Sequence, residues 1–411
     1  QDISHNVIVI MDNDDASGQT LTLELSGVDY SGIVEVSRVT IEIPRQTFID
    51  LSDNNNAAFG REYDISASVS DAAGNAAEVK ITNFIMDKTK PIIKSVDMSG
   101  VEDGGYLQVA QQDISHNVTV VMENDDASGQ TLTLELSGVD YSGIVEVSRV
   151  TIEIPRQTFI DLSDNNIAGG LSYDISASVS DGAGNPADVK SISFIVDKTK
   201  PTIVATIECD NSTNDVTIAR DGDTITLSLT MDASTNVPTV TFKSGGDDIS
   251  GSVTYDPSSG TSKTWTVTYD VSSADTDGDV TIDISVNDLA DNWTANFTTI
   301  SGDTVRVDKL LPDISSVVLS WGERLSKTEA DVSGTVTVTM ATTDDHGKTV
   351  TLGLNGETYT GDISGSSVDI EIPIVDLQDL SDNTTERTYD MSVNITDSAG
   401  NSATEFIKQF I

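Results

Sequence analysis

The stretch 181–201, DGAGNPADVKSISFIVDKTKP, contains the features that decide the fold of this chain. A turn with Gly and Asn opens it, an alternating apolar strand follows, and a charged segment ending in proline closes it. Nearly the same text occupies residues 71–91, as DAAGNAAEVKITNFIMDKTKP. The repetition predicts a repeated structural unit, with this stretch forming the last strand of one unit and the linker into the next.

The repeat continues along the chain with a period close to that of one β-sandwich domain. Residues 1–55 and 112–166 differ at only three positions. Two more divergent copies contain TIDISVNDLADN (281–292) and TYDMSVNITDSAGN (388–401). The linker aspartates Asp87, Asp197 and Asp308 are 110 and 111 residues apart. This spacing matches a sandwich of about 100 residues and exceeds the periods of helical solenoids.

The segments between the turns have the pattern of β-strands. NVTVVM, TLTLELSG and RVTIEIP alternate apolar and polar residues, and clusters of Gly, Asn, Asp and Ser separate them. No stretch shows a convincing helical period. We predict an all-β protein of four tandem Ig-like antiparallel β-sandwich domains in an extended array. The expected boundaries are 1–88, 89–198, 199–309 and 310–411, and the first domain lacks its first strand.

The missing strand has two explanations. Copies two to four begin with a segment after the linker proline, such as PIIKSVDMSGVEDGGYLQVAQ (91–111), whereas the first copy opens at QDISHNV. The chain could be a window of a longer array. Alternatively, it could be a subunit whose first strand is supplied by a neighbour, because an open sheet edge is a template for pairing.

Charge and composition exclude several function classes. Lys and Arg number 22 against 67 Asp and Glu, a net charge of −45, so nucleic acid and anionic membranes would repel the chain. We see no apolar run long enough to span a bilayer. The three histidines are scattered, no serine lies in an elbow motif, and the carboxylate pairs recur in copies instead of marking one cleft. We therefore expect no enzymatic activity.

Aspartates recur at matched places in the copies and are candidate cation ligands. Oxygen ligands without His or Cys partners suit Ca²⁺. The alternative is that each aspartate only accepts backbone N–H bonds in its turn. The candidates occupy the turn (Asp71, Asp181, Asp288, Asp397), the linker (Asp87, Asp197, Asp308) and the motif DTDGD of the third copy (Asp275, Asp277, Asp279). That motif lacks the distal glutamate of a full calcium loop, and its counterpart in the other copies is DLSDN.

The DxxGN turn, the apolar strand and VDKTKP together resemble the bacterial and archaeal immunoglobulin-like (Big-type) repeats of surface-layer proteins and giant adhesins. The resemblance covers all four copies and is weaker in the third, where DLADN lacks the glycine. It implies sandwiches chained end to end, with Ca²⁺ stiffening the domain junctions in several such arrays. Position by position, it makes ligand candidates of the turn and linker aspartates. A strand separates Asp181 from Asp197, so one ion cannot bind both. Asp197 is the better junction candidate, and Asp181 would pair with another loop or serve the turn.

Asn-x-Ser/Thr triplets are candidate glycosylation sites, and an unmodified asparagine is the alternative at each. They occur at Asn117, Asn211, Asn292, Asn296, Asn383 and Asn394.

These features predict an extracellular, cell-surface structural protein. We expect a scaffold of a surface layer or surface filament, rigidified by Ca²⁺, whose partners are copies of itself and, where it is glycosylated, glycans. The segment would bind no nucleic acid and would not insert into a membrane. The alternative is the stalk of a calcium-dependent adhesin that projects a ligand-binding domain.

Overall fold

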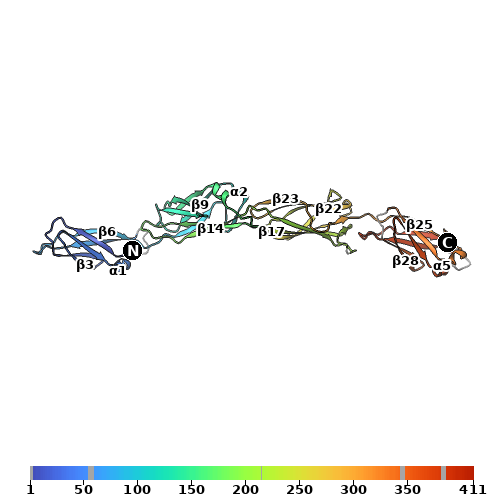
Figure 1. Ribbon diagram of the computed structural model, residues 1–411, viewed down its shortest axis with the longest axis horizontal. Helices are drawn as coiled ribbons and strands as arrows, with labels where there is room; N and C mark the ends of the chain where they lie inside the picture. Colours follow the sequence, from blue (N-terminus) through green and yellow to red (C-terminus); the bar gives the residue numbers. More distant parts are fainter. Residues whose placement is uncertain (1–2, 54–59, 214, 343–347, 381–385) are drawn as a thin grey trace. The chain divides into compact units, whose positions relative to one another are not determined.

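The computed structural model describes residues 3–53, 60–213, 215–342, 348–380 and 386–411 (Figure 1). The regular structure of these ranges is dominated by antiparallel β-sheets, which confirms the predicted class of tandem Ig-like β-sandwiches. Buried side chains form four cores, within residues 7–86, 93–196, 203–307 and 314–410. The chain divides into two compact units, Gln1–Asn165 with Gly170–Asp197 and Asn166–Gly169 with Lys198–Ile411. The exact boundaries of the four domains stay a prediction.

The first sandwich packs a two-stranded sheet, β1-β4, against a four-stranded sheet in the order β3-β2-β5-β6. Its elements are β1 (His5–Ile10), β2 (Thr20–Leu25), β3 (Val28–Ile33), β4 (Arg38–Ile43), α1 (Arg45–Asp50), β5 (Arg61–Ser68) and β6 (Lys80–Met86). Alternation directs one face of each strand inward. In β4 the side chains of Val39, Ile41 and Ile43 are buried, and the residues between them are exposed.

The second sandwich completes the first unit with the sheets β12-β9-β7 and β11-β10-β13-β14-β8. The segment that follows the linker proline contributes a strand to each sheet. The elements are β7 (Ile93–Met98), β8 (Gly105–Leu107), α2 (Val109–Gln112), β9 (His116–Met122), β10 (Thr131–Leu136), β11 (Val139–Ile144), β12 (Arg149–Ile154), α3 (Arg156–Asp161), β13 (Leu171–Ser178) and β14 (Lys190–Val196).

The third sandwich, in the second unit, pairs β15-β17-β21-β20 in one sheet. Its other sheet has the order β16-β24-β22-β18-β19, and β23 pairs with β22. The strands are β15 (Ile203–Cys209), β16 (Ile218–Ala219), β17 (Thr224–Thr235), β18 (Thr239–Ser244), β19 (Asp247–Asp248), β20 (Val253–Asp256), β21 (Ser262–Asp270), β22 (Gly278–Asn287), β23 (Trp293–Phe297) and β24 (Arg306–Val307).

The fourth sandwich has the sheets β25-β26-β29 and β28-β27-β30-β31. Its elements are β25 (Ile314–Leu319), α4 (Lys327–Ala330), β26 (Gly334–Met340), β27 (Thr349–Leu354), β28 (Glu357–Asp362), β29 (Ser367–Ile372), α5 (Ile374–Leu380), β30 (Tyr389–Ile395) and β31 (Phe406–Phe410).

Short helices that the sequence pattern did not predict close one end of three sandwiches. α1, α3 and α5 each follow a proline, whose fixed φ suits a helix start. Each covers its core with a buried residue, Phe48, Phe159 or Leu377. Helices of six or seven residues are too short to show a helical period, so tertiary packing has to stabilise them.

A tyrosine anchors the loop that follows helix α1. The hydroxyl of Tyr63 donates a hydrogen bond to the backbone oxygen of Ser52, at 2.7 Å. Tyr173 makes the equivalent bond to Ser163 at 2.6 Å. The bond holds the loop against the sandwich and so positions Asp53, which follows Ser52 directly.

Candidate functional site

The candidate site of the first unit is built around the linker 87–91, which follows β6. The amino group of Lys88 donates to the backbone oxygens of Ile49 at 2.7 Å and Leu51 at 2.6 Å. These oxygens lie at the carboxyl end of α1, where helical carbonyl groups lack partners within the helix. Lys88 therefore ties the start of the linker to the sandwich that precedes it.

Two carboxylates hold the backbone of the same linker. Asp53 Oδ2 accepts from the backbone N–H of Lys88 at 3.1 Å and from the hydroxyl of Thr89 at 3.3 Å. Asp87 Oδ1 accepts from the backbone N–H of Thr89 at 3.0 Å. Both carboxylates are buried. The linker thus leaves β6 in a conformation determined by hydrogen bonds from distant residues as well as from its own.

The DxxGN turn of the second sandwich binds this linker from the other side. Asp181 Oδ1 accepts from the backbone N–H groups of Ala183 at 2.9 Å and Asn185 at 2.8 Å. The Asn185 side-chain amide donates to Asp181 Oδ2 at 2.8 Å and to the backbone oxygen of Asp87 at 3.1 Å. The turn therefore connects the second sandwich to the linker that precedes it.

Several buried carboxylates around the first linker interact unfavourably. Burial raises the pKa of Asp87 above the ordinary 3.8, and the negative charges of Asp181 and Asp53 add to the effect. Burial likewise raises the pKa of Asp126, with contributions from Asp87 and Asp181. Asp126 lies beside Asn124, whose side-chain amide donates to the linker at the backbone oxygen of Lys90, at 3.4 Å, and accepts from the N–H of the next residue but one, Ile92, at 3.2 Å. These carboxylates form a negatively charged cluster whose ionisation costs free energy.

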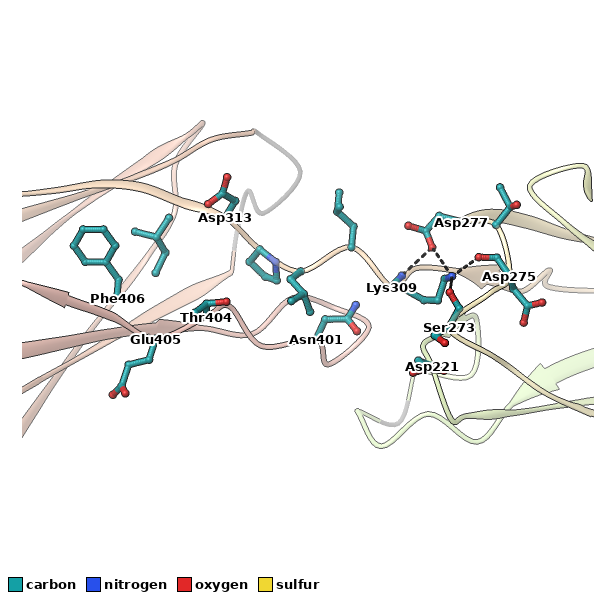
Figure 2. Close-up of a pocket in the computed structure, with 15 residues that line it drawn as sticks. Asp221, Ser273, Asp275, Asp277, Lys309, Asp313, Asn401, Thr404, Glu405 and Phe406 are labelled. Atoms are coloured by element: carbon teal, nitrogen blue, oxygen red, sulfur yellow. Dashed lines mark hydrogen bonds and ion pairs between the residues drawn. The ribbon is translucent and has the colours of Figure 1, made fainter. Parts of the chain in front are cut away.

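The linker 308–312 of the second unit makes the same set of contacts with different residues (Figure 2). Lys309 donates its amino group to the backbone oxygens of Ser273, at 2.9 Å, and Asp275. Its backbone N–H donates to Asp277 Oδ1 at 3.2 Å. Asn401 donates to the backbone oxygen of Asp308 at 2.9 Å. Lys309, Asp277 and Asn401 therefore correspond to Lys88, Asp53 and Asn185.

Additional bonds from the third sandwich hold the turn that contains Asn401. The amide of Asn211 donates to the backbone oxygen of Ala399 at 2.8 Å, and Arg220 donates to that of Gly400. Burial raises the pKa of Asp308, and the charge of Asp397 contributes to the increase. At both Asp87 and Asp308, burial is the main cause of the raised pKa and the turn aspartate adds to it, whereas at Asp308 the positive charge of Arg306 opposes the increase.

In every copy the turn aspartate closes its own turn. Oδ1 accepts from the N–H four residues on, at 2.8–2.9 Å, and Oδ2 accepts from that residue's side-chain amide, at 2.8–3.0 Å. For Asp71, the bonds from Asn75 lower the pKa of the carboxyl. These contacts are the ones expected of turn residues. They apply to Asp71, Asp181, Asp288 and Asp397.

The three aspartates of DTDGD have separate surroundings. Asp275 is buried and accepts from the backbone N–H of Ser250 at 2.9 Å and of Ser272 at 2.7 Å. Asp277 binds the linker, as described above, and Asp279 is exposed on β22. The carboxylates thus serve two loops and a strand surface. The remaining linker candidate, Asp197, is buried, and its backbone oxygen accepts from the side chain of Gln112 at 3.0 Å.

Among the described residues, no group of three or more His, Cys, Asp and Glu side chains is arranged to hold a metal ion. The chemistry of the first-linker cluster nevertheless suits a hard cation. Asp87, Asp126 and Asp181 are buried, offer only oxygen, and the pKa values of Asp87 and Asp126 are raised. Binding of Ca²⁺ would require these carboxylates to move closer together.

The candidate glycosylation sites differ in accessibility. Asn117, Asn296 and Asn394 are exposed, and Asn383 lies outside the described residues. Asn211 and Asn292 are buried. The Asn211 amide donates to Ile218, Asp223 and Ala399, at 2.7, 3.0 and 2.8 Å. A glycan would remove such bonds, so we predict that Asn211 is unmodified in the folded chain.

The sequence analysis did not identify the residues that make most of the contacts with the linkers. Lys88 and Lys309 were visible as the lysine of the repeated DK motif, and Asn185 and Asn401 as the last residue of DxxGN. The positions of these lysines and asparagines in the repeats showed that they recur, but not which groups they bind in the folded chain. Asp126 lies in DDASG, a segment with no distinguishing signal for this role.

The chain is similar to parts of several solved structures. No family model matches the chain, and no curated protein matches it. Over its whole length it is similar to 93% of a Ca²⁺-stabilized adhesin that helps an Antarctic bacterium reach out and bind ice, at 21% identity and TM-score 0.39. A structure concerned with host cell surface retention of a 1.5-MDa bacterial ice-binding adhesin matches 79% of this chain and 98% of its own, at 23% identity and TM-score 0.41. Chicken CNTN1 FN1–FN3 domains match 78% of this chain and 99% of their own, at 10% identity and TM-score 0.23.

None of the described helices has the length and hydrophobicity needed to cross a bilayer.

Proposed function

We propose that this chain is a non-enzymatic, extracellular structural segment whose Ig-like sandwiches are joined in series, as in the stalk of a surface adhesin. Its role is to hold and space consecutive sandwiches and whatever adjoins them. Each sandwich, with the boundaries 1–88, 89–198, 199–309 and 310–411, is one domain of this segment.

The observation that supports the proposal is the matched set of contacts at the linkers 87–91 and 308–312. In both, a lysine binds carbonyl groups of the preceding sandwich and an aspartate of that sandwich accepts from the lysine N–H. In both, an asparagine of the following sandwich binds the linker aspartate. Contacts that recur between consecutive sandwiches of different sequence suit serial connection, whereas a lattice depends on lateral contacts.

Calcium is part of the proposal. Ionising Asp87 and Asp126 costs folding free energy, because their pKa values are raised by burial and by neighbouring carboxylates. A divalent cation bound at this cluster would neutralise the charge and stiffen the linker. Asp87, Asp126 and Asp181 would provide oxygen ligands, and the site at the last linker would draw on Asp308 and Asp397.

A second candidate function is a surface-layer or filament scaffold. The divergence of the third and fourth copies favours it, since each sandwich of a lattice meets different neighbours. Electron microscopy of the concentrated chain with Ca²⁺ separates the two functions. The stalk predicts separate particles, and ordered sheets would favour the lattice.

Calcium titration of three proteins tests the role of the cluster. The wild-type chain should bind Ca²⁺ in calorimetry and unfold at a higher temperature with it, because ligand binding stabilises the folded state. D87N/D126N removes two charges of the cluster, so Ca²⁺ should raise its unfolding temperature less, by most of the part that the first linker contributes. D29N changes an exposed aspartate of β3 and should respond as the wild type does. An equal response of all three, or no response of the wild type, would contradict the calcium proposal.

A further inference from the structure

The first sandwich has an open flank made of the outer edges of β1 and β6. β1 pairs with β4, and in the described part of the chain no strand pairs with its other edge. Antiparallel strands direct alternate backbone groups to each neighbour, so part of the β1 backbone faces outward without a strand partner. Apolar side chains accompany it, since Ile8 is 49% exposed and Ile10 is 73% exposed.

The second sandwich has nearly the same sequence and shows what covers this flank. β9 is the counterpart of β1 and pairs with β12 in the same register, with His116 opposite Ile154 as His5 is opposite Ile43. β7 lies on the outer edge of β9, with Val96 opposite Val120. Under this cover Val120 is fully buried, whereas its counterpart Val9 is only half-buried.

The segment of residues 91–111, which contains β7 and is called the covering segment below, also reaches the other sheet. After β7 the chain crosses over, and β8 pairs in parallel with β14, the counterpart of β6. Leu107 of β8 enters the core and is fully buried. Phe194 of β14 is also fully buried, whereas its counterpart Phe84 is half-buried. One segment therefore closes both sheets of the second sandwich on one side.

A histidine contacts the covering segment in the second sandwich and has an exposed counterpart in the first. In the second sandwich, His116 is buried, and its ring nitrogens lie 3.1 Å from the backbone oxygen of Ser99 and 2.8 Å from that of Gln111. Both oxygens belong to the covering segment. His5 packs on Phe48 at 4.9 Å, as His116 packs on Phe159, yet it is exposed. The ring of His5 is thus already oriented for such partners.

In the third and fourth sandwiches, a segment after the linker proline also closes both sheets, although its sequence differs. In the third, β15 pairs with β17 and then β16 pairs with β24 of the other sheet. In the fourth, β25 pairs with β26. Further along the chain the backbone N–H of Leu325 donates to the backbone oxygen of Ile411 at 2.7 Å, and the N–H of Ile411 donates to that of Glu323 at 2.9 Å. Closure by one segment after the linker proline is therefore a property of this sandwich type.

We propose that the flank formed by β1 and β6 is an acceptor site for one extended segment of the type of residues 91–111, supplied from outside residues 1–411. The segment would pair antiparallel with β1 and in parallel with β6. Aliphatic side chains at the places of Val96 and Leu107 would enter the core, and its carbonyl groups would contact His5. Main-chain pairing gives such recognition its affinity, and alternate side chains give its specificity.

The test uses the full 411-residue chain and a synthetic peptide with the sequence of residues 91–111. We expect binding, slower hydrogen exchange of the β1 and β6 amides by about tenfold or more, and a changed His5 ring signal in NMR. The β9 amides provide an internal control and should be unaffected. A control peptide carrying V96D and L107D should bind at least about tenfold more weakly, because both residues would bury a charge.

A covalent version gives an independent measurement. A chain with residues 89–111 copied ahead of residue 1 should show the same protection of β1 and β6, without added peptide. The proposal is overturned if the native and control peptides bind equally, or if protection maps elsewhere. It is also overturned if the unmodified chain dimerises through β1, since a second copy would then be the occupant.

Discussion

Replacing Asn185 with alanine tests whether the DxxGN turn connects consecutive sandwiches or only closes itself. The side chain makes two hydrogen bonds, one within the turn to Asp181 and one to the linker at the backbone oxygen of Asp87. Asn75 offers a matched control. It makes the same bond to Asp71 at 2.8 Å, and its turn has no preceding linker among the described residues.

The magnitude follows from the bonds that each variant loses. Both N185A and N75A lose the bond to the aspartate of their own turn, so this loss is common to the two variants. N185A also loses the bond to the Asp87 carbonyl, worth about 0.5–1.5 kcal/mol. The difference of about 1 kcal/mol corresponds to roughly a fivefold change in the equilibrium between closed and open linker.

Native-state hydrogen exchange measures this equilibrium at the linker. The N–H groups of Lys88 and Thr89 are bonded to Asp53 and Asp87, and they exchange when the linker opens. In N185A they should exchange about fivefold faster, and in N75A at the wild-type rate. If both variants leave these amides unchanged, or accelerate them equally, the connecting role of the turn is wrong.

Three further outcomes are expected. Without divalent cations, the stabilisation from the raised pKa values of Asp87 and Asp126 is complete below pH 3.8 and is lost as the pH rises through the raised values. The melting temperature of the wild type should therefore fall with rising pH more steeply than that of D87N/D126N, and parallel curves would contradict this. Lys88→Met keeps the aliphatic stem but removes the bonds to α1, so limited proteolysis should cut the linker several times faster, and an unchanged rate would refute the contact. Gly60→Ala should lower the free energy of unfolding by about 2 kcal/mol or more, because φ is +70° and a Cβ would lie 2.5 Å from a backbone oxygen of β6. Gly74→Ala, where φ is +88° but the space around a Cβ is open, should cost only about 1 kcal/mol. Thermal melts of both variants measure the two losses, and equal losses would argue against the close contact.

The sequence by itself determined the β class, the repeat and the location of the linkers. Strict alternation in segments such as RVTIEI allows only one face to be apolar, and that face is buried in β4. The repeated DKTKP also marked the linker, because proline fixes the backbone where a strand cannot continue. These features are local, so neighbouring residues suffice to reveal them.

Only the tertiary structure decided what these polar residues bind. Asn185 binds an oxygen 98 residues earlier in the chain, and Asp53 binds a linker 35 residues later. No local pattern contains such partners, because they meet only after two sheets have packed. The same holds for Asn211, which resembles a glycosylation site in sequence but is buried and donates a hydrogen bond to a turn 188 residues away. Folding brought these groups together, and burial of Asp87 among them then raised the pKa of that carboxyl.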